Sequence, residues 1–225
     1  MRSAIYLCSD FVSIIIVKMA EVINSYFPDL TVRQRNQFDI ILNEYPALND
    51  KINVISRKDI DNLEVNHILH SLAIARYIDF CPGSAVMDLG SGGGFPGIPL
   101  AIIFPDVSFH LIDRIGKKIS VARQIAEKAD LTNVTFQHGD SGECKRKFDF
   151  VVSRAVMRQQ QLIRAVRKNI SAKSINALPN GLISLKGGDL REELRGLERL
   201  SEVVPVSQYF SEPFFETKKI VYTQI

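Results

Sequence analysis

The sequence predicts an α/β fold in which helices cover both faces of a mostly parallel sheet and a helical region precedes the sheet. From residue 84 onwards, apolar strand-like runs alternate with amphipathic segments, a pattern typical of parallel sheets. The stretch VMDLGSGGGFPGIPL reads as a buried strand that ends in a glycine loop and opens a helix. The last apolar runs, 203–210 and 218–223, are joined through Glu212 and Pro213, which favours an antiparallel hairpin at one sheet edge.

Composition bounds the class of protein. The chain has 225 residues, 46% hydrophobic and 24% charged, which favours one folded domain with an appendage over a fibre or a disordered chain. The net charge is only +3, but residues 114–173 hold 14 Lys and Arg against 5 Asp and Glu. This local excess of positive charge favours a polyanionic partner such as a nucleic acid.

Three cysteines are scattered without C-x-x-C spacing, which favours reduced thiols in the cytoplasm and no zinc site. No apolar run has the length of a membrane span. Residues 4–17 are apolar but interrupted by Asp10, so a signal peptide is disfavoured. Residues 1–18 are therefore either an extension from a start codon upstream of Met19 or a loosely attached helix.

The N-terminal region, 19–82, reads as helical and precedes a sheet-containing domain, 83–225. Thr31 is a plausible N-cap of a first helix, which a loop through Pro46 and Asn49 is expected to follow. A second amphipathic helix spans 65–77. Further strands are expected near 85–89, 107–112, 133–137, 148–153 and 181–186, and helices over about 96–104, 115–130, 158–172 and 189–201.

The glycine loop fits two kinds of nucleotide ligand. Its glycines satisfy both the dinucleotide pattern G-x-G-x-x-G and the G-x-G-x-G pattern of S-adenosylmethionine (SAM) enzymes. Asp113, 19 residues after Gly94, is placed to accept from a ribose hydroxyl pair in either case. Asp88, at the strand's end, favours a cationic, amino-acid-bearing cofactor, and free amides of the following helix, with Pro96 in its first turn, favour a polar or anionic group. An NAD(P)-dependent oxidoreductase and a purely structural turn remain the alternatives.

Several segments together carry a family resemblance: LNDKINVISRKD, NHILHSLAIA, VMDLGSGGGFPGIPLAI, LIDRIGKKISVAR, FDFVVSRAV and GLISLKGG. In this order they resemble the bacterial 16S ribosomal RNA guanine-N7 methyltransferases, also called glucose-inhibited division protein B. The resemblance implies a class I SAM-dependent methyltransferase fold, with a Rossmann-like seven-stranded sheet and SAM as the cofactor. The implied target is a guanine in the 530 loop of 16S ribosomal RNA, reached by a cytoplasmic monomer that binds neither DNA nor a membrane.

The resemblance also implies which residues contact SAM. Together with the loop pattern, the predicted cofactor-binding residues are Asp88, Gly90, Gly92, Phe95, Asp113, Ser141, Gly142 and Arg154. Many relatives have an Ala-Glu-like pair at Ser141-Gly142, so the backbone there, Asp140 or Glu143 is the candidate contact for adenine. The Phe95 ring either stacks on a base or packs under the new helix. His70 stands where many relatives carry Asp.

Methylation of guanine N7 needs no general base, because N7 carries a free lone pair at neutral pH; no catalytic base and no metal are expected. Arg154 and Lys186, each ending a strand, are candidates for positioning the substrate. Glu64, His67 and His70 share a helix face that we interpret as a helix–helix contact. Candidate RNA-binding residues are Arg57, Lys58, Lys117, Lys118 and Arg158. A non-catalytic RNA-binding assembly factor is the remaining alternative.

Overall fold

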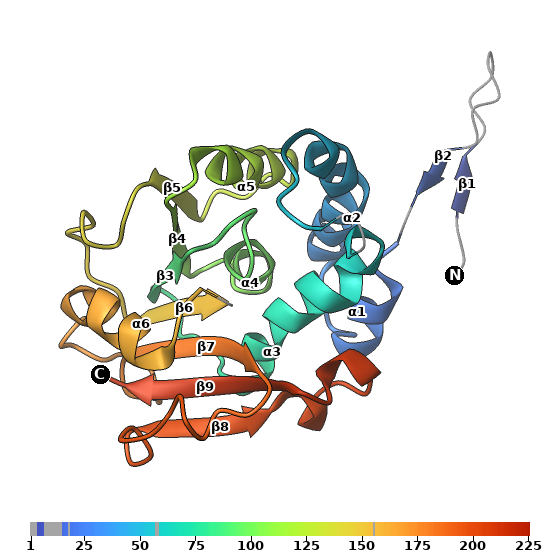
Figure 1. Cartoon of the computed structure of the whole chain (residues 1–225). Helices are drawn as coiled ribbons and strands as arrows, with labels where there is room; N and C mark the ends of the chain where they lie inside the picture. Colours follow the sequence, from blue (N-terminus) through green and yellow to red (C-terminus); the bar gives the residue numbers. More distant parts are fainter. Residues whose placement is uncertain (1–3, 7–14, 18, 57–58, 155) are drawn as a thin grey trace.

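A computed structural model describes residues 4–6, 15–17, 19–56, 59–154 and 156–225 (Figure 1). Its main sheet has seven strands in the order β5-β4-β3-β6-β7-β9-β8. They are β3 (Ala85–Leu89), β4 (Ser108–Asp113), β5 (Val134–His138), β6 (Phe150–Arg154), β7 (Gly181–Gly187), β8 (Ser201–Pro205) and β9 (Lys218–Gln224). In this order, neighbouring strands from β5 through β4, β3 and β6 to β7 pair in parallel. Strand β9 is antiparallel to both β7 and β8. The predicted fold class and its edge hairpin are confirmed.

Six α-helices are present in the described residues: α1 (Glu21–Tyr26), α2 (Val32–Ile52), α3 (His70–Tyr77), α4 (Gly97–Ile103), α5 (Gly116–Lys128) and α6 (Gln159–Val166). Single 3₁₀ turns cover Ile60–Asn62, Arg167–Asn169, Val206–Gln208 and Pro213–Phe215. A π-helical stretch, Leu63–Leu69, leads directly into α3.

Helix α2 begins as predicted but ends later. Thr31 forms a capping box with Gln34, which satisfies two amides at the helix start. The predicted loop at Pro46 is wrong, because α2 continues to Ile52. Proline removes one backbone hydrogen bond, but buried side chains on either side of it, such as Tyr45 and Leu48, keep the helix packed against the core.

Three other segments differ from the prediction. Residues 189–200 form turns and not a helix, and glycines with positive φ at Gly188 and Gly196 interrupt a regular helical path there. Helix α6 ends at Val166, after which a 3₁₀ turn brings Ile170 into a bridge with Phe148. Strands β1 (Ala4–Tyr6) and β2 (Ile15–Val17) form an antiparallel pair instead of a helix, apart from the rest of the fold (Figure 1).

The sheet has different helical cover on its two faces. Val86 of β3 belongs to a large apolar cluster that also contains side chains of α2, α3, α4 and α5. Met87 and Leu89, one and three positions after Val86 and so on the opposite face of the strand, belong to a second cluster with α6. The N-terminal helices therefore share a core with one face of the sheet. No helix within the described residues is both long and apolar enough to cross a bilayer.

Candidate active site

A cavity of about 730 Å³ lies where the parallel strands end. The loops after β3, β4, β6 and β7 line it, as expected for ligand sites in open α/β sheets. Two further segments complete the wall of the cavity: the stretch before α3 and the turn before β9. The predicted site residues that line it are Gly90, Gly92, Phe95, Asp113, Lys118, Ser141, Arg154 and Lys186. Arg57 and Lys58 lie outside the described residues.

The glycine loop leaves open space toward the cavity. Gly92 has φ +56°, and a Cβ placed there would meet no atom within 4 Å. Gly93 also lines the cavity, but a Cβ placed there would lie 1.7 Å from the hydroxyl of Tyr45. One glycine thus leaves room on the ligand side, and its neighbour lets helix α2 approach the loop.

Asp113, at the end of β4, holds the loop in this shape. One carboxylate oxygen accepts from the amide of Gly92 at 2.8 Å, and the other accepts from the amide of Ile115 at 2.8 Å. Each oxygen of an ionised carboxylate has a further lone pair. The Asp113 carboxylate can therefore accept from a ligand hydroxyl without giving up its bonds to the loop.

Asp88 lies near the end of β3 as expected, but its carboxylate binds within the protein. Its side chain is fully buried and does not line the cavity, and its Oδ2 accepts from the amide of Gly97 at 2.7 Å. Desolvation raises the pKa of Asp88 to about 7. The helix amide expected to favour a ligand already has a protein partner, and Pro96 precedes α4 (Gly97–Ile103) and is not part of its first turn. Asp88 joins strand to helix, and this geometry does not support a direct cofactor contact.

Beyond β5, Asp140 and Ser141 line the cavity, whereas Gly142 does not. The amide of Gly142 donates to Asp140 at 2.8 Å and lowers the pKa of that carboxyl, as does the ion pair with Arg114. Ser141 is buried, with its hydroxyl 3.3 Å from both Asp140 Oδ1 and the carbonyl of Ala165. Asp140 is thus an ionised acceptor next to Asp113, at the β4–β5 end of the cavity.

Arg154 lies at the opposite end and is held by neutral groups. Its guanidinium donates to the carbonyl of Asn66 at 3.2 Å and to Nδ1 of His67 at 3.0 Å. It also lies over the Phe95 ring, 5.2 Å from the centroid. This buried ring position agrees with the packing interpretation of Phe95. Among the described residues no carboxylate forms an ion pair with Arg154, and although desolvation lowers its pKa to about 10, it stays cationic at neutral pH.

His67 links Arg154 to Asp59. Its Nε2 lies 2.5 Å from Asp59 Oδ2, and Asn66 donates to the other oxygen of that carboxylate at 2.6 Å. Because arginine can only donate, Nδ1 of His67 must accept, and the proton is on Nε2. Burial, together with the charge of Arg154, lowers the pKa of His67 to about 4. His67 is therefore a neutral acceptor and not the helix–helix contact expected from the sequence.

Of the three residues on the predicted helix face, Glu64 makes the expected helix–helix contact, because it accepts from the amides of Val22 and Ile23 and caps α1. His67 and His70 instead line the cavity. The π-helical stretch widens the turn between these residues.

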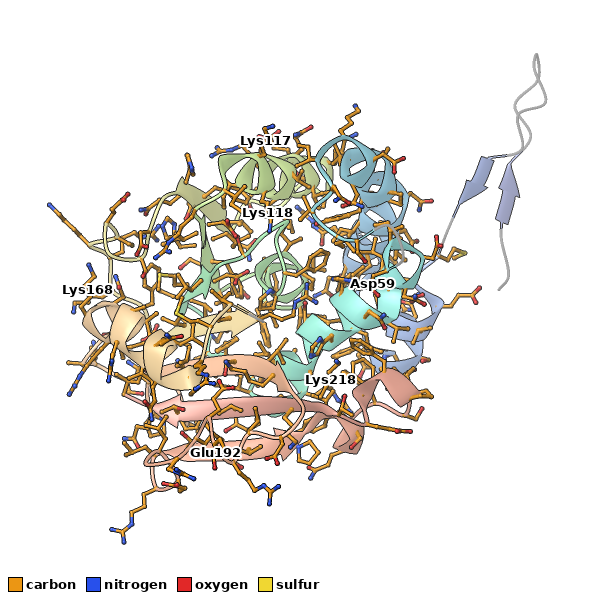
Figure 2. The ribbon with its side chains drawn as sticks, in the orientation of Figure 1. Asp59, Lys117, Lys118, Lys168, Glu192 and Lys218 are labelled. Carbon is orange, nitrogen blue, oxygen red and sulfur yellow. The ribbon has the colours of Figure 1, made fainter. Side chains whose placement is uncertain are left out.

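The basic candidate residues differ in where they lie. Lys186 is mostly buried and tied to the carbonyl of Met157 at 2.5 Å and to Glu193 at 2.7 Å. Lys118 lines the cavity, whereas Lys117 on the same helix does not; both are labelled in Figure 2. Arg158 is exposed, lies just before α6 and does not line the cavity. Sequence reasoning missed Lys218, which lines the cavity with its amine 4.5 Å from the centroid of the Phe214 ring (Figure 2).

The fold is similar to solved methyltransferase structures. Precorrin-6y C5,15-methyltransferase from Geobacter metallireducens GS-15 gives a TM-score of 0.54 at 14% identity, over 77% of this chain and 92% of that one. A SAM-dependent O-methyltransferase from Thermotoga maritima gives 0.51 at 17% identity, over 69% of this chain and 64% of that one. At these identities the likeness concerns the fold alone.

Sequence comparison is more specific. The family described as rRNA small subunit methyltransferase G matches residues 34–220. Ribosomal RNA small subunit methyltransferase G of Bacteroides thetaiotaomicron is 57% identical over 205 residues, which cover 91% of this chain and 100% of that protein. The protein of the same name from Cytophaga hutchinsonii is 46% identical over 202 residues, covering 90% of this chain and 98% of that one. With matches of this extent, the chain belongs to the rRNA small subunit methyltransferase G family.

Proposed function

We propose that this protein transfers the methyl group of SAM to N7 of a guanine in the 530 loop of 16S ribosomal RNA. The observation that carries the proposal is the asymmetry of one cavity in a chain of this family. Carboxylates and a glycine loop line one end, and a guanidinium that pairs with no carboxylate of the described residues lines the other.

The lining residues fit SAM. A volume of about 730 Å³ is within the usual range for small-molecule sites. Asp113 would accept from the ribose hydroxyls, and Asp140 with the Ser141–Gly142 segment would border the adenine. The space in front of Gly92 would receive the chain that joins ribose to methionine, next to Gly90. Bound there, SAM supplies a methyl group on a sulfonium for in-line displacement.

The residues around Arg154 would position the acceptor. A guanidinium fork suits guanine O6, a phosphate or a carboxylate, and its two neutral partners leave its charge available to such a group. Guanine N7 attacks with its own lone pair and has no proton to lose. His67 is not available as a base, because its Nδ1 accepts from Arg154 and its Nε2 carries a proton. Catalysis would rest on alignment of the two reactants.

Basic side chains at the rim would bind RNA phosphates and set the orientation of the substrate. Lys118 and Lys218 line the cavity, and we keep Lys117, Arg158, Arg57 and Lys58 as further candidates. Lys186 is a weaker candidate for substrate positioning, because Glu193 already neutralises it. The proposed partner is 16S ribosomal RNA or the small subunit, bound by a monomer in the cytoplasm, and neither DNA nor a membrane is a proposed partner.

Family membership favours this function over an NAD(P)-dependent oxidoreductase and over a non-catalytic assembly factor. Calorimetry tests the first contrast: we expect SAM to bind and NAD not to bind. Mapping of methylated nucleotides in 16S RNA after deleting and then restoring the gene tests the second. Loss and return of one N7-methylguanine in the 530 loop is expected. Binding of SAM without any change in RNA methylation would contradict the proposal.

A further inference from the structure

His70, the first residue of α3, also lines the cavity. It is only 6% exposed, and its ring packs edge-on against Phe214 and Phe215, with centroids 5.5 and 6.0 Å away. Within the described residues its Nε2 is buried and has no hydrogen-bond partner. A buried polar atom of this kind costs free energy unless a ligand or another group satisfies it.

The surroundings of the ring indicate what Nε2 can do. The backbone of Asn66 acts to raise the pKa of the imidazole, as a carbonyl beside a ring N–H does, and since Nε2 is unpartnered we assign the proton to Nδ1. Burial, with the nearby charges of Arg154 and Lys218, lowers the pKa of His70 well below its ordinary value. The ring is therefore neutral, and Nε2 presents a lone pair that needs a donor.

The position of His70 indicates which ligand brings that donor. The ring lies at the Arg154 end of the cavity and packs against Phe214. The positive charges of Arg154 and Lys218 are close enough to lower its pKa. The acceptors suited to the ribose and adenine, Asp113 and Asp140, follow β4 and β5 at the other end. A donor at His70 is thus expected from the methyl acceptor and not from the cofactor.

We propose that His70 reads the target base as guanine, its Nε2 accepting from N1–H or the 2-amino group while Arg154 donates to O6. Guanine presents an acceptor at O6 followed by donors at N1 and N2. Adenine presents a donor at N6, an acceptor at N1 and no amino group at C2. A donor from Arg154 and an acceptor from a neutral His70 match O6 and N1–H of guanine, whereas adenine would meet them with a donor at N6 and an acceptor at N1. Contacts on this edge of the base leave N7 free for methylation. The inference rests on the proposed function and adds the means of base selection.

The test uses the full-length protein and 16S RNA with guanine or adenine at the target position, as the free RNA or small subunit that the wild type methylates. His70→Phe keeps an aromatic ring against Phe214 and removes the acceptor. We expect kcat/KM for guanine to fall about 10- to 100-fold, with little change for adenine, so that the guanine preference shrinks. His70→Gln, whose amide oxygen can reach the same region, should recover part of the guanine preference. SAM affinity should stay within about twofold of wild type.

A matched control is His110→Phe. His110 is also a buried histidine that packs on a phenylalanine ring, but it does not line the cavity. This variant should keep the guanine preference. An unchanged preference in His70→Phe would overturn the inference, and so would a loss of SAM affinity alone, which would assign His70 to the cofactor. If the phenylalanine variant does not fold by circular dichroism, His70→Leu is measured in its place, with the same outcomes. A wild type that methylates no guanine would instead reject the proposed function.

Discussion

The two ends of the cavity differ in chemistry and in how the chain builds them. At the β4–β5 end, Asp113 and Asp140 are acceptors, and each binds the amide two residues further along the chain. At the β6–β7 end, Arg154 takes its partners from the segment before α3, 87 and 88 residues earlier. The first end suits the hydroxyls of a nucleoside, and the second suits an anionic or carbonyl group of the incoming substrate. Binding of the cofactor and positioning of the substrate should therefore respond to different mutations.

The largest expected effect is at Arg154. Arg154→Ala should lower kcat/KM for RNA methylation roughly 10²- to 10³-fold, because the substrate loses its main oriented donor. Arg154→Lys should not restore the rate, since one ammonium cannot reproduce the planar fork. Radiolabelled methyl incorporation gives the measurement.

Arg146 offers a matched control for Arg154. It also donates to a histidine Nδ1, at 3.0 Å, and lies over a phenylalanine ring, 5.4 Å from its centroid, but outside the cavity. Arg146→Ala should keep near-normal activity. Equal losses of activity in Arg154→Ala and Arg146→Ala would show that the loss does not depend on the place of the arginine in the cavity.

The next largest effect is expected on SAM binding, at the β4–β5 end of the cavity. Asp113→Asn should weaken SAM binding about 10- to 100-fold, because one acceptor for the ribose is replaced by a donor. Calorimetry measures this directly, and RNA binding by filter retention should be unchanged. A variant that binds SAM normally but fails to bind RNA would reverse our assignment of the two ends.

Titration of His67 gives a third contrast. The pKa of His67 is about 4 in the folded protein against an ordinary 6.5, so the unfolded state binds more protons between these values. The free energy of unfolding should therefore rise with pH from about 4 to 6.5, by up to roughly 3 kcal/mol, and then level off. Activity should be flat from about pH 7 upwards and fall toward pH 4, where an imidazolium cannot accept from Arg154.

Urea unfolding of the wild type and of His67→Phe across this pH range checks the assignment. Subtracting the two series removes the contribution of other groups, and the difference should carry the slope. Parallel series with no difference would mean that His67 titrates normally.

The smallest effect separates two neighbouring lysines on α5. Lys118 lines the cavity and Lys117 does not, so Lys118→Ala should raise the Kd for RNA a few-fold more than Lys117→Ala. The excess should shrink as salt is added, since phosphate contacts are screened. Filter binding at two salt concentrations is the measurement. Identical salt dependence in both variants would place the RNA path elsewhere on the surface.

The difference between the two ends also explains what the sequence could predict. The glycine loop and Asp113 form a local pattern, so strand, loop and acceptor were predicted together. Asp59, His67 and Lys218 belong to no such pattern, and only tertiary packing brings them to Arg154 or to its cavity. Arg154 was found through its place after a strand, but its neutral partners were not.

The errors in the fold have the same origin. Pro46 favours a helix end locally, but burial of its neighbours overrides that preference. The leucines of 189–201 recur with helical spacing, yet the segment follows Gly188 and forms turns in which Leu190 and Leu194 still reach an apolar cluster. Asp88 was placed correctly at its strand's end, but the sequence does not reveal that its carboxylate turns inward to the Gly97 amide.

The contact between Tyr45 and the glycine loop has a consequence for any attempt to shorten the chain. The tyrosine hydroxyl donates to the carbonyl of Gly93 at 3.3 Å, in a space that a single methyl group would fill. A fragment that starts at β3 would contain the whole seven-stranded sheet, but water would replace Tyr45 of α2 behind the glycine loop. We expect such a fragment to bind nucleosides weakly, so a minimal version of this enzyme must begin before α2.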